Sequence, residues 1–255
     1  MVFRKLKHSY TSQLKGTNLM YKRIVIKLSG EALASKEDLY EESTIDNIIS
    51  DIITVVQNGV QVGLAIGGGN IWRGRSSNKI DKTKADQMGM LATIINSMYI
   101  CEKLKERGQG AVVFTPFVVG AFTTLYSKEA ALQCLNQGNI AIFGGGIGHP
   151  FFSTDTIPVL RACELNCDCV LFAKNINGVY DKNPNLYDNA VRYEKLTYRK
   201  IIQENLEAMD IAAMVLCENN NIPSVVFSLA YPNSIQLVAL NNTKTYEFGT
   251  TINVS

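Results

Sequence analysis

The sequence lacks the features of several large protein classes. Its six cysteines include no Cys-x-x-Cys pair, and its two histidines are too few to complete a zinc site with them. The uncharged stretch between Arg107 and Lys128 is broken by Gln109, Pro116 and scattered glycines, so it predicts a buried strand and a loop instead of a membrane span. These absences argue against a disulfide scaffold, a zinc module and a membrane protein. They predict a cytoplasmic protein with buried, reduced thiols.

A strong net charge is also missing. The 255 residues carry a formal charge of +2, but residues 1–20 contain four basic residues and no acidic one. Subtracting these four from 25 leaves 21 basic against 23 acidic residues, a net charge of −2 for the rest of the chain. The body of the protein is therefore not a polycation, and we expect no binding to nucleic acid or to membrane surfaces.

The basic start of the chain has two explanations. A segment rich in basic and hydroxyl residues fits an organelle transit peptide. Met20, however, stands directly before the first predicted strand and could itself initiate, which favours a disordered extension over residues 1–20. Because no repeat or linker divides the remaining chain, we expect residues 21–255 to form a single domain.

Hydrophobic patterning predicts alternating strands and helices. Runs rich in valine, isoleucine and phenylalanine predict buried strands at 23–28, 60–66, 111–115, 139–144, 169–174 and 223–228. Helical spacing of apolar residues predicts helices at 43–58 with Ser43 or Thr44 as the cap, 84–107, 127–137, 154–166, 207–220 and 232–240, whereas residues 175–195 look like a loop. This order predicts an α/β fold with a mostly parallel sheet covered on both faces.

Three predicted strand ends carry unusual residues, and ligands of such sheets bind at the carboxyl ends of strands. The sequences are "KLSGE" at 27–31, "GGGNIWRG" at 67–74 and "GGGIGHPFFSTDT" at 144–156. The two glycine clusters offer bare backbone amides leading into a helix, which is an arrangement that binds phosphate. Close packing of a turn would also explain the glycines.

Two basic residues extend the prediction of a phosphate site. Arg73 can add a charged fork to the amides. Lys27 lies in an apolar strand, so it should point into a polar cleft, where an ammonium group suits a transferring phosphoryl group. The alternative for Lys27 is an edge-strand charge that reaches solvent. Neither a P-loop motif nor a G-x-G-x-x-G motif occurs, which argues against P-loop kinases and Rossmann dehydrogenases.

Six segments in unbroken order closely resemble the bacterial uridylate kinases of the amino acid kinase family. They are "YKRIVIKLSGEAL" (21–33), "QVGLAIGGGNIWRG" (61–74), "ADQMGMLATIIN" (85–96), "PFFSTDT" (150–156), "NGVYDKNP" (177–184) and "LTY" to "MDIAA" (196–213). The resemblance implies a three-layer αβα sandwich that transfers the γ-phosphoryl group of ATP to UMP in pyrimidine nucleotide biosynthesis. It also implies a UMP-binding half at about 21–166, an ATP-binding half at about 167–255, a homohexamer, activation by GTP and inhibition by UTP.

The resemblance further implies which residues form the site. Those expected at ATP are Lys27, Leu28, Ser29, Gly30, Gly69, Arg73, Lys174, Asn175, Tyr180 and Asn183. Those expected at UMP are Gly68, Asp86, Ile147, Gly148, His149, Pro150, Phe151, Phe152, Ser153 and Thr154. Lys27, Arg73, Asp155 and Asp210 are the predicted catalytic residues, acting by alignment and charge because a phosphate acceptor needs little deprotonation. Asp155 and Asp210 are expected to hold Lys27 and Mg²⁺ in position. Mg²⁺ is expected to bind mainly through the ATP phosphates, without a protein metal site.

Several of these residues also have a plain structural explanation. Asp86 could be a first-turn helix acid, Phe151 and Phe152 could be core residues, and Tyr180 could simply pack. His149 stands where many relatives have asparagine, and it could either replace that donor or be an exposed loop imidazole.

The chain also departs from the family pattern. Ile147 replaces a common threonine, which leaves the preference for UMP over CMP open. Asn177 and Asn183 replace common aspartates, so the affinity for ATP could be lower than in relatives. Two other functions therefore stay open: an amino acid kinase acting on a carboxylate or carbamate, and a non-catalytic nucleotide-binding assembly.

Overall fold

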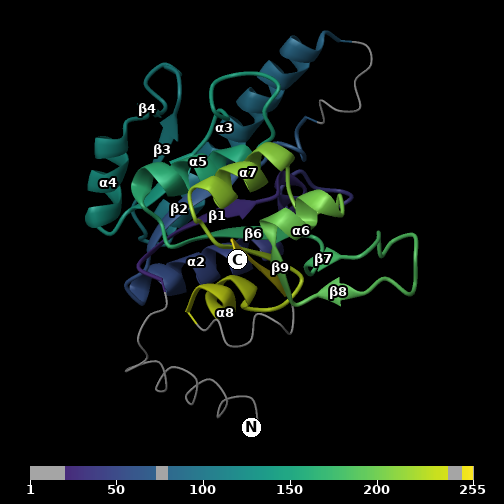
Figure 1. Cartoon of the computed structure of the whole chain (residues 1–255). Helices are drawn as coiled ribbons and strands as arrows, with labels where there is room; N and C mark the ends of the chain where they lie inside the picture. Colours follow the sequence, from purple (N-terminus) through teal and green to yellow (C-terminus); the bar gives the residue numbers. More distant parts are fainter. Residues whose placement is uncertain (1–20, 73–79, 241–248, 255) are drawn as a thin grey trace.

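The structure is a computed structural model that describes residues 21–72, 80–240 and 249–254. Its centre is a nine-stranded sheet in the order β4-β3-β5-β2-β1-β6-β10-β11-β9 (Figure 1). The strands are β1 (Arg23–Leu28), β2 (Gln61–Ile66), β3 (Ala111–Thr115), β4 (Thr124–Leu125), β5 (Ile140–Phe143), β6 (Cys169–Lys174), β9 (Lys195–Thr197), β10 (Ser224–Ser228) and β11 (Gly249–Asn253). Every pairing in the sheet is parallel except that of β10 with β11.

Helices cover both faces of this sheet. One face packs against α2 (Glu42–Gln57), α3 (Lys82–Glu106) and α8 (Ser234–Leu240). The other packs against α4 (Lys128–Asn136), α5 (Thr156–Leu165), α6 (Tyr198–Gln203) and α7 (Ile211–Asn219). A short 3₁₀ helix, η1 (Gly30–Leu33), follows β1. The predicted three-layer αβα sandwich with a mostly parallel sheet is therefore confirmed.

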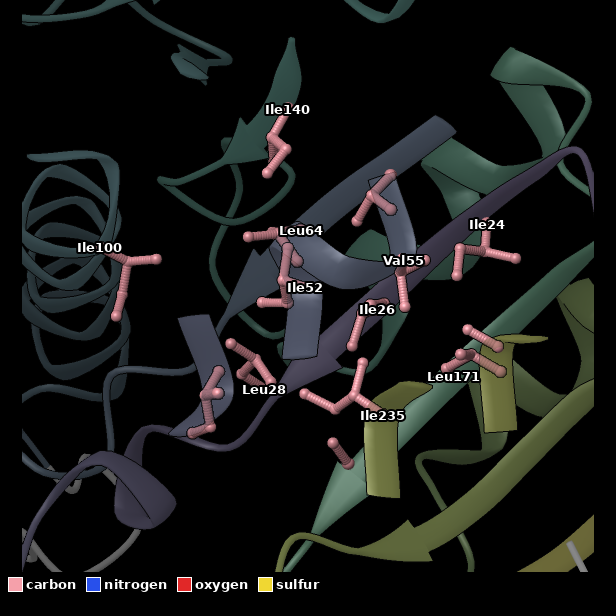
Figure 2. Packing of buried hydrophobic residues seen from close by; sticks show 14 of the residues in the cluster. Ile24, Ile26, Leu28, Ile52, Val55, Leu64, Ile100, Ile140, Leu171 and Ile235 are labelled. Atoms are coloured by element: carbon pink, nitrogen blue, oxygen red, sulfur yellow. The ribbon is translucent and has the colours of Figure 1, made fainter. Parts of the chain in front are cut away.

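The central strand β1 shows how the sheet divides the core. Its alternate residues Ile24, Ile26 and Leu28 enter the cluster that contains α2, where Ile52 and Val55 meet them (Figure 2). Val25 enters the cluster on the opposite face. Lys27 is two residues after Val25, so its side chain lies on the same face of the sheet, which is the face covered by α5. The position of Lys27 along the strand, and not its residue type, therefore decides which layer of helices its side chain faces.

Each predicted strand and helix is present, with ends that differ by up to four residues. The largest shift is at α7, which begins at Ile211 after Asp210 as its N-cap. The predicted cap of α2 was wrong: Glu41 is the N-cap, and its carboxylate accepts a hydrogen bond from the Thr44 N–H at 2.7 Å. The Glu41 side chain is long enough to reach the first turn of α2. The Ser43 hydroxyl donates a hydrogen bond to the Glu41 carboxylate and does not cap the helix.

The segment 175–195 is not only a loop. It contains β7 (Val179–Tyr180) and β8 (Arg192–Tyr193), which form a separate antiparallel pair that extends from the body (Figure 1). Strands of two residues carry too little alternation to be predicted from hydrophobic pattern. None of the helices in the described residues combines the length and apolar character that crossing a lipid bilayer requires.

Candidate active site

A cleft of about 770 Å³ opens where the carboxyl ends of β1, β2, β5 and β6 meet. Strand order reverses at β1, because the chain builds β2, β3 and β5 on one side of it and β6 and β10 on the other. The crevice at such a reversal is the usual ligand site of an open parallel sheet. The fold therefore places this cleft where the sequence pattern predicts a ligand.

Two lysines converge on one carboxylate in the cleft. Asp155 lies 2.9 Å from the Lys27 ammonium through Oδ1 and 3.6 Å from the Lys174 ammonium through Oδ2. Lys174 also donates to the Ala208 carbonyl at 2.6 Å, which joins the end of β6 to the loop before α7. Lys27 is buried in the middle of the sheet, so the edge-strand explanation for it is wrong.

The side chain of Asp155 does not cap the helix that follows it. It is the N-cap residue of α5, yet its side chain makes no capping hydrogen bond. Burial alone would raise the pKa of its carboxyl, but the charges of Lys27 and Lys174 outweigh burial and lower the pKa to about 2. For Lys174, burial is the largest influence and lowers its pKa, with Asp155 opposing and Lys27 adding to the effect. The three groups form one charged cluster with a net positive charge, which suits an anion.

The lowered pKa of Asp155 predicts a dependence of stability on pH. Its ordinary value is 3.8, so the unfolded chain takes up the proton before the folded one as the pH falls. The resulting stabilisation, about 2 kcal/mol, is present above about pH 5 and is lost as the pH falls towards 2. Urea denaturation of the wild type and Asp155→Asn from about pH 7 to pH 3 should show a shrinking difference between them. A difference that stays constant with pH would contradict this assignment.

The first glycine turn, residues 67–69, is shaped by backbone packing. A Cβ added to Gly30 would lie 2.5 Å from the Gly67 carbonyl oxygen, and one added to Gly68 would lie 2.8 Å from the Ala92 Cβ. Such distances exclude any side chain at Gly30 and Gly68. The packing explanation therefore accounts for these two glycines, whether or not a phosphate also lies beside them.

The first glycine turn does not lead directly into a helix, so that part of the prediction was wrong. The N–H groups of Ile71 and Trp72 both donate to the Gly68 carbonyl, closing a turn. Helix α3 begins only at Lys82, after its cap Asp81. Arg73 lies outside the described residues, so its predicted role stays a prediction.

The second glycine turn, residues 144–146, is less bare than expected. The Gly144 N–H donates to the Phe114 carbonyl at 3.0 Å, and the Gly145 N–H donates to the Thr93 hydroxyl at 2.9 Å. Both amides are therefore used inside the protein, and the prediction that they are open to a ligand was wrong. Gly146 lines the cleft with a φ of +66°, a conformation that favours glycine.

Asp86 ties α3 to the loop after the second glycine turn. Its Oδ2 accepts the Phe151 N–H at 2.8 Å, and the Lys82 ammonium lies 3.8 Å from the same oxygen. Phe151 has a left-handed φ of +70°, and its ring lies 5.2 Å from the Lys82 ammonium. Phe151 and Phe152 are both more than half exposed, so the core explanation for these rings is wrong.

Most of the predicted site residues line this cleft. They are Lys27, Ser29, Gly30, Gly68, Gly69, Asp86, Ile147, His149, Phe152, Ser153, Thr154, Asp155, Lys174 and Asn175. His149 is exposed as well as cleft-lining, which leaves both explanations for it open.

Seven predicted residues are described but do not line the cleft. They are Leu28, Gly148, Pro150, Phe151, Tyr180, Asn183 and Asp210. The Leu28 side chain is in the core, and the Tyr180 hydroxyl donates to Asn177 at 2.5 Å. Asp210 caps α7, because its carboxylate accepts a hydrogen bond from the Ala212 N–H. A ligand role for any of these seven stays a prediction.

The structure adds residues that sequence reasoning missed. Glu31, Trp72, Ala85, Gly89, Met90, Thr93, Gly146, Ile176 and Asn185 also line the cleft. Met90 and Thr93 lie within the "ADQMGMLATIIN" segment, where their places one and two helical turns beyond Asp86 could have identified them. Nothing in the local pattern marks Ile176 or Asn185, because only the tertiary fold brings that segment to the cleft.

Comparisons with known proteins agree with this arrangement. A model of the amino acid kinase family matches residues 22–228, a range that contains every residue lining the cleft. The solved structure of a UMP kinase from Bacillus anthracis matches with a TM-score of 0.86 and 36% identity, over 92% of this chain and 97% of that one. A UMP kinase from Ureaplasma parvum matches with a TM-score of 0.84 and 31% identity, over 91% of this chain and 98% of that one.

Proposed function

Because this chain belongs to the amino acid kinase family, we propose that it is a UMP kinase, which transfers the γ-phosphoryl group of ATP to UMP and releases UDP and ADP. One observation carries the proposal: the match to the Bacillus anthracis UMP kinase extends over 97% of that chain, so it includes both sides of the cleft. The Lys27–Asp155–Lys174 cluster lies in the same cleft as the glycine turns and supplies a matching anion site.

The geometry supports catalysis by position and charge. Lys27 is held by Asp155 at 2.9 Å, so its ammonium is already oriented before a nucleotide binds. A fixed positive charge stabilises phosphoryl oxygens as they gain charge during transfer, and a buried site strengthens that effect. We assign UMP to the half at about 21–166, near Asp86 and residues 147–154, and ATP to the half at about 167–255, near Lys174 and Asn175. The acceptor is a phosphate, so no general base is required.

The residues fit a magnesium ion carried by the nucleotide. Among the described residues there is no cluster of three or more histidine, cysteine, aspartate or glutamate side chains that could hold a metal. Mg²⁺ prefers phosphate oxygens and water with few protein ligands, and such a donor set needs no dedicated cage. Bound in that way, the ion would neutralise charge on the β- and γ-phosphates. A homohexamer, activation by GTP, inhibition by UTP and a cytoplasmic location belong to the same proposal and rest on the family resemblance.

Coupled measurement of ADP release with UMP, CMP, acetylglutamate, aspartate and carbamate as acceptors tests this function. We expect turnover with UMP well above the ATP hydrolysis measured without an acceptor. Comparison of UMP with CMP also decides the preference that Ile147 and His149 leave open. Turnover with a carboxylate or carbamate but not with UMP would overturn the proposal. The absence of ADP release with every acceptor would favour a non-catalytic nucleotide-binding assembly.

A further inference from the structure

Asn96 is a fully buried amide in the middle of α3, outside the cleft. Its Nδ2 donates to the Gly67 carbonyl and to the Asn70 side-chain oxygen, both at 2.7 Å. Its Oδ1 accepts from the Tyr40 hydroxyl at 2.7 Å and from the Asn70 amide at 3.3 Å. All four hydrogen-bonding positions of this amide are therefore used, which leaves it a single orientation.

The bond to Gly67 determines how the first glycine turn faces the cleft. In a trans peptide the C=O and N–H groups point in opposite directions. Since the Gly67 carbonyl is turned towards Asn96 in α3, the N–H of Gly68 in the same peptide is turned away from α3. Gly68 lines the cleft, and its N–H has no hydrogen-bond partner within residues 21–72, 80–240 and 249–254. Within the described residues, the Gly68 N–H is thus a donor without a protein acceptor beside the cleft, where we place the phosphates.

The same helix also holds the second glycine turn. Thr93, one helical turn before Asn96, accepts the Gly145 N–H at 2.9 Å. A Cβ on Gly68 would contact Ala92 of α3, and a Cβ on Gly144 would lie 2.9 Å from the Ser97 hydroxyl. Both glycine turns are therefore placed against one rigid element, so their separation is set by α3.

We propose that Asn96 is a positioning residue for phosphoryl transfer, which acts by orienting the Gly67–Gly68 peptide so that the Gly68 N–H points into the cleft. This inference rests on the proposed function, because it treats the first glycine turn as the place where the phosphates meet. Asn96 touches neither nucleotide. Its effect passes through the peptide that it holds.

Steady-state kinetics of Asn96→Ala tests the inference, with Cys101→Ala as the control. Cys101 is also buried on α3, but its thiol donates to the Ala111 carbonyl of β3 at 3.5 Å and it does not line the cleft. Misplacement of a donor by about 1 Å can cost 100-fold in rate, so we expect Asn96→Ala to lower kcat by about 30-fold. Both KM values should stay within about threefold, because the oriented donor matters most in the transition state. Cys101→Ala should keep kcat within about twofold.

Rates are expressed per active site, counted by the stoichiometry of ATP binding, so that a loss of folded protein is not mistaken for a loss of kcat. Equal kcat values for Asn96→Ala and Cys101→Ala would overturn the inference. If Asn96→Ala does not fold, Tyr40→Phe decides, because it removes one partner of Asn96 while the ring stays stacked on Tyr99 at 3.9 Å. That variant should lower kcat about threefold, and an unchanged kcat would overturn the inference.

A separate measurement distinguishes this inference from the proposed function. If the wild type shows no turnover with UMP, the proposed function fails. The affinity for inorganic tripolyphosphate, measured by calorimetry, then tests the positioning role of Asn96 without any acceptor. Binding about tenfold weaker in Asn96→Ala than in Cys101→Ala would support the inference, and equal binding would overturn it.

Discussion

Lys27→Ala is expected to lower kcat for UMP phosphorylation by about 1000-fold while changing the KM values for ATP and UMP by only about threefold. Lys27 is 7% exposed, and its ammonium lies in the cleft at the end of the central strand, 2.9 Å from Asp155. A charge fixed in so buried a place needs no reorganisation when the phosphoryl group moves. It therefore stabilises the transition state more than either bound nucleotide.

Lys105→Ala is the matched control for Lys27→Ala. Lys105 pairs with Glu102 on the exposed face of α3, at 2.8 Å, and it does not line the cleft. Lys105→Ala removes a lysine side chain of the same kind at a position away from the phosphate site, so kcat should be unchanged. Initial-rate measurements over ranges of ATP and UMP separate kcat from both KM values. If kcat of Lys27→Ala matched that of the control, Lys27 would lie outside the reaction path.

Gly30→Ala should both destabilise the protein and abolish most of its activity. The new Cβ would lie 2.5 Å from the Gly67 carbonyl oxygen and 2.7 Å from the Gly69 nitrogen. Both are backbone atoms of the first glycine turn, which directly follows β2 and is hydrogen-bonded to the end of β1, so neither can move without displacing that turn. Overpacking of this kind costs about 3 kcal/mol of unfolding free energy. A turn displaced by about 1 Å should lower kcat by about 100-fold.

Gly69→Ala provides the comparison for stability. The three described atoms nearest to its Cβ would all belong to the Glu31 side chain, with Cγ at 3.1 Å, and a flexible side chain can move aside. We therefore expect a loss of less than about 1 kcal/mol for this variant. Urea denaturation monitored by circular dichroism measures both changes. Equal losses for the two variants would show that backbone contact at Gly30 does not decide the shape of the turn.

The elements of the fold were predictable because buried parallel strands carry nearly continuous apolar runs. β1 and β6 were found at their observed bounds for this reason. The helix caps and the short strands were less predictable. Glu41 caps α2 through a long side chain that ordinary cap preferences do not favour, and β7 and β8 are too short to show alternation.

The candidate site was predictable where its residues stand directly at strand ends. Ser29 follows β1, Gly68 follows β2, and Lys174 ends β6, so parallel pairing alone brings them to one edge of the sheet. The partners of these residues were not predictable in the same way. Whether an amide faces a ligand or another part of the protein depends on what packs behind it. The Gly145 N–H faces the Thr93 hydroxyl of α3, and no local sequence pattern shows this contact.

The sequence by itself determined the α/β layering, the positions of the long strands and the set of polar residues at their carboxyl ends. These follow from which side chains avoid water and from the short-range geometry of the chain. The expected hold of Asp155 on Lys27 is confirmed. The tertiary structure alone decided that Lys174 joins this pair, that Gly30 and Gly68 are required by packing, and that Asn96 binds the Gly67 carbonyl of the first glycine turn. Each of these depends on distances of a few ångströms between segments far apart in the chain, which only the folded packing brings together.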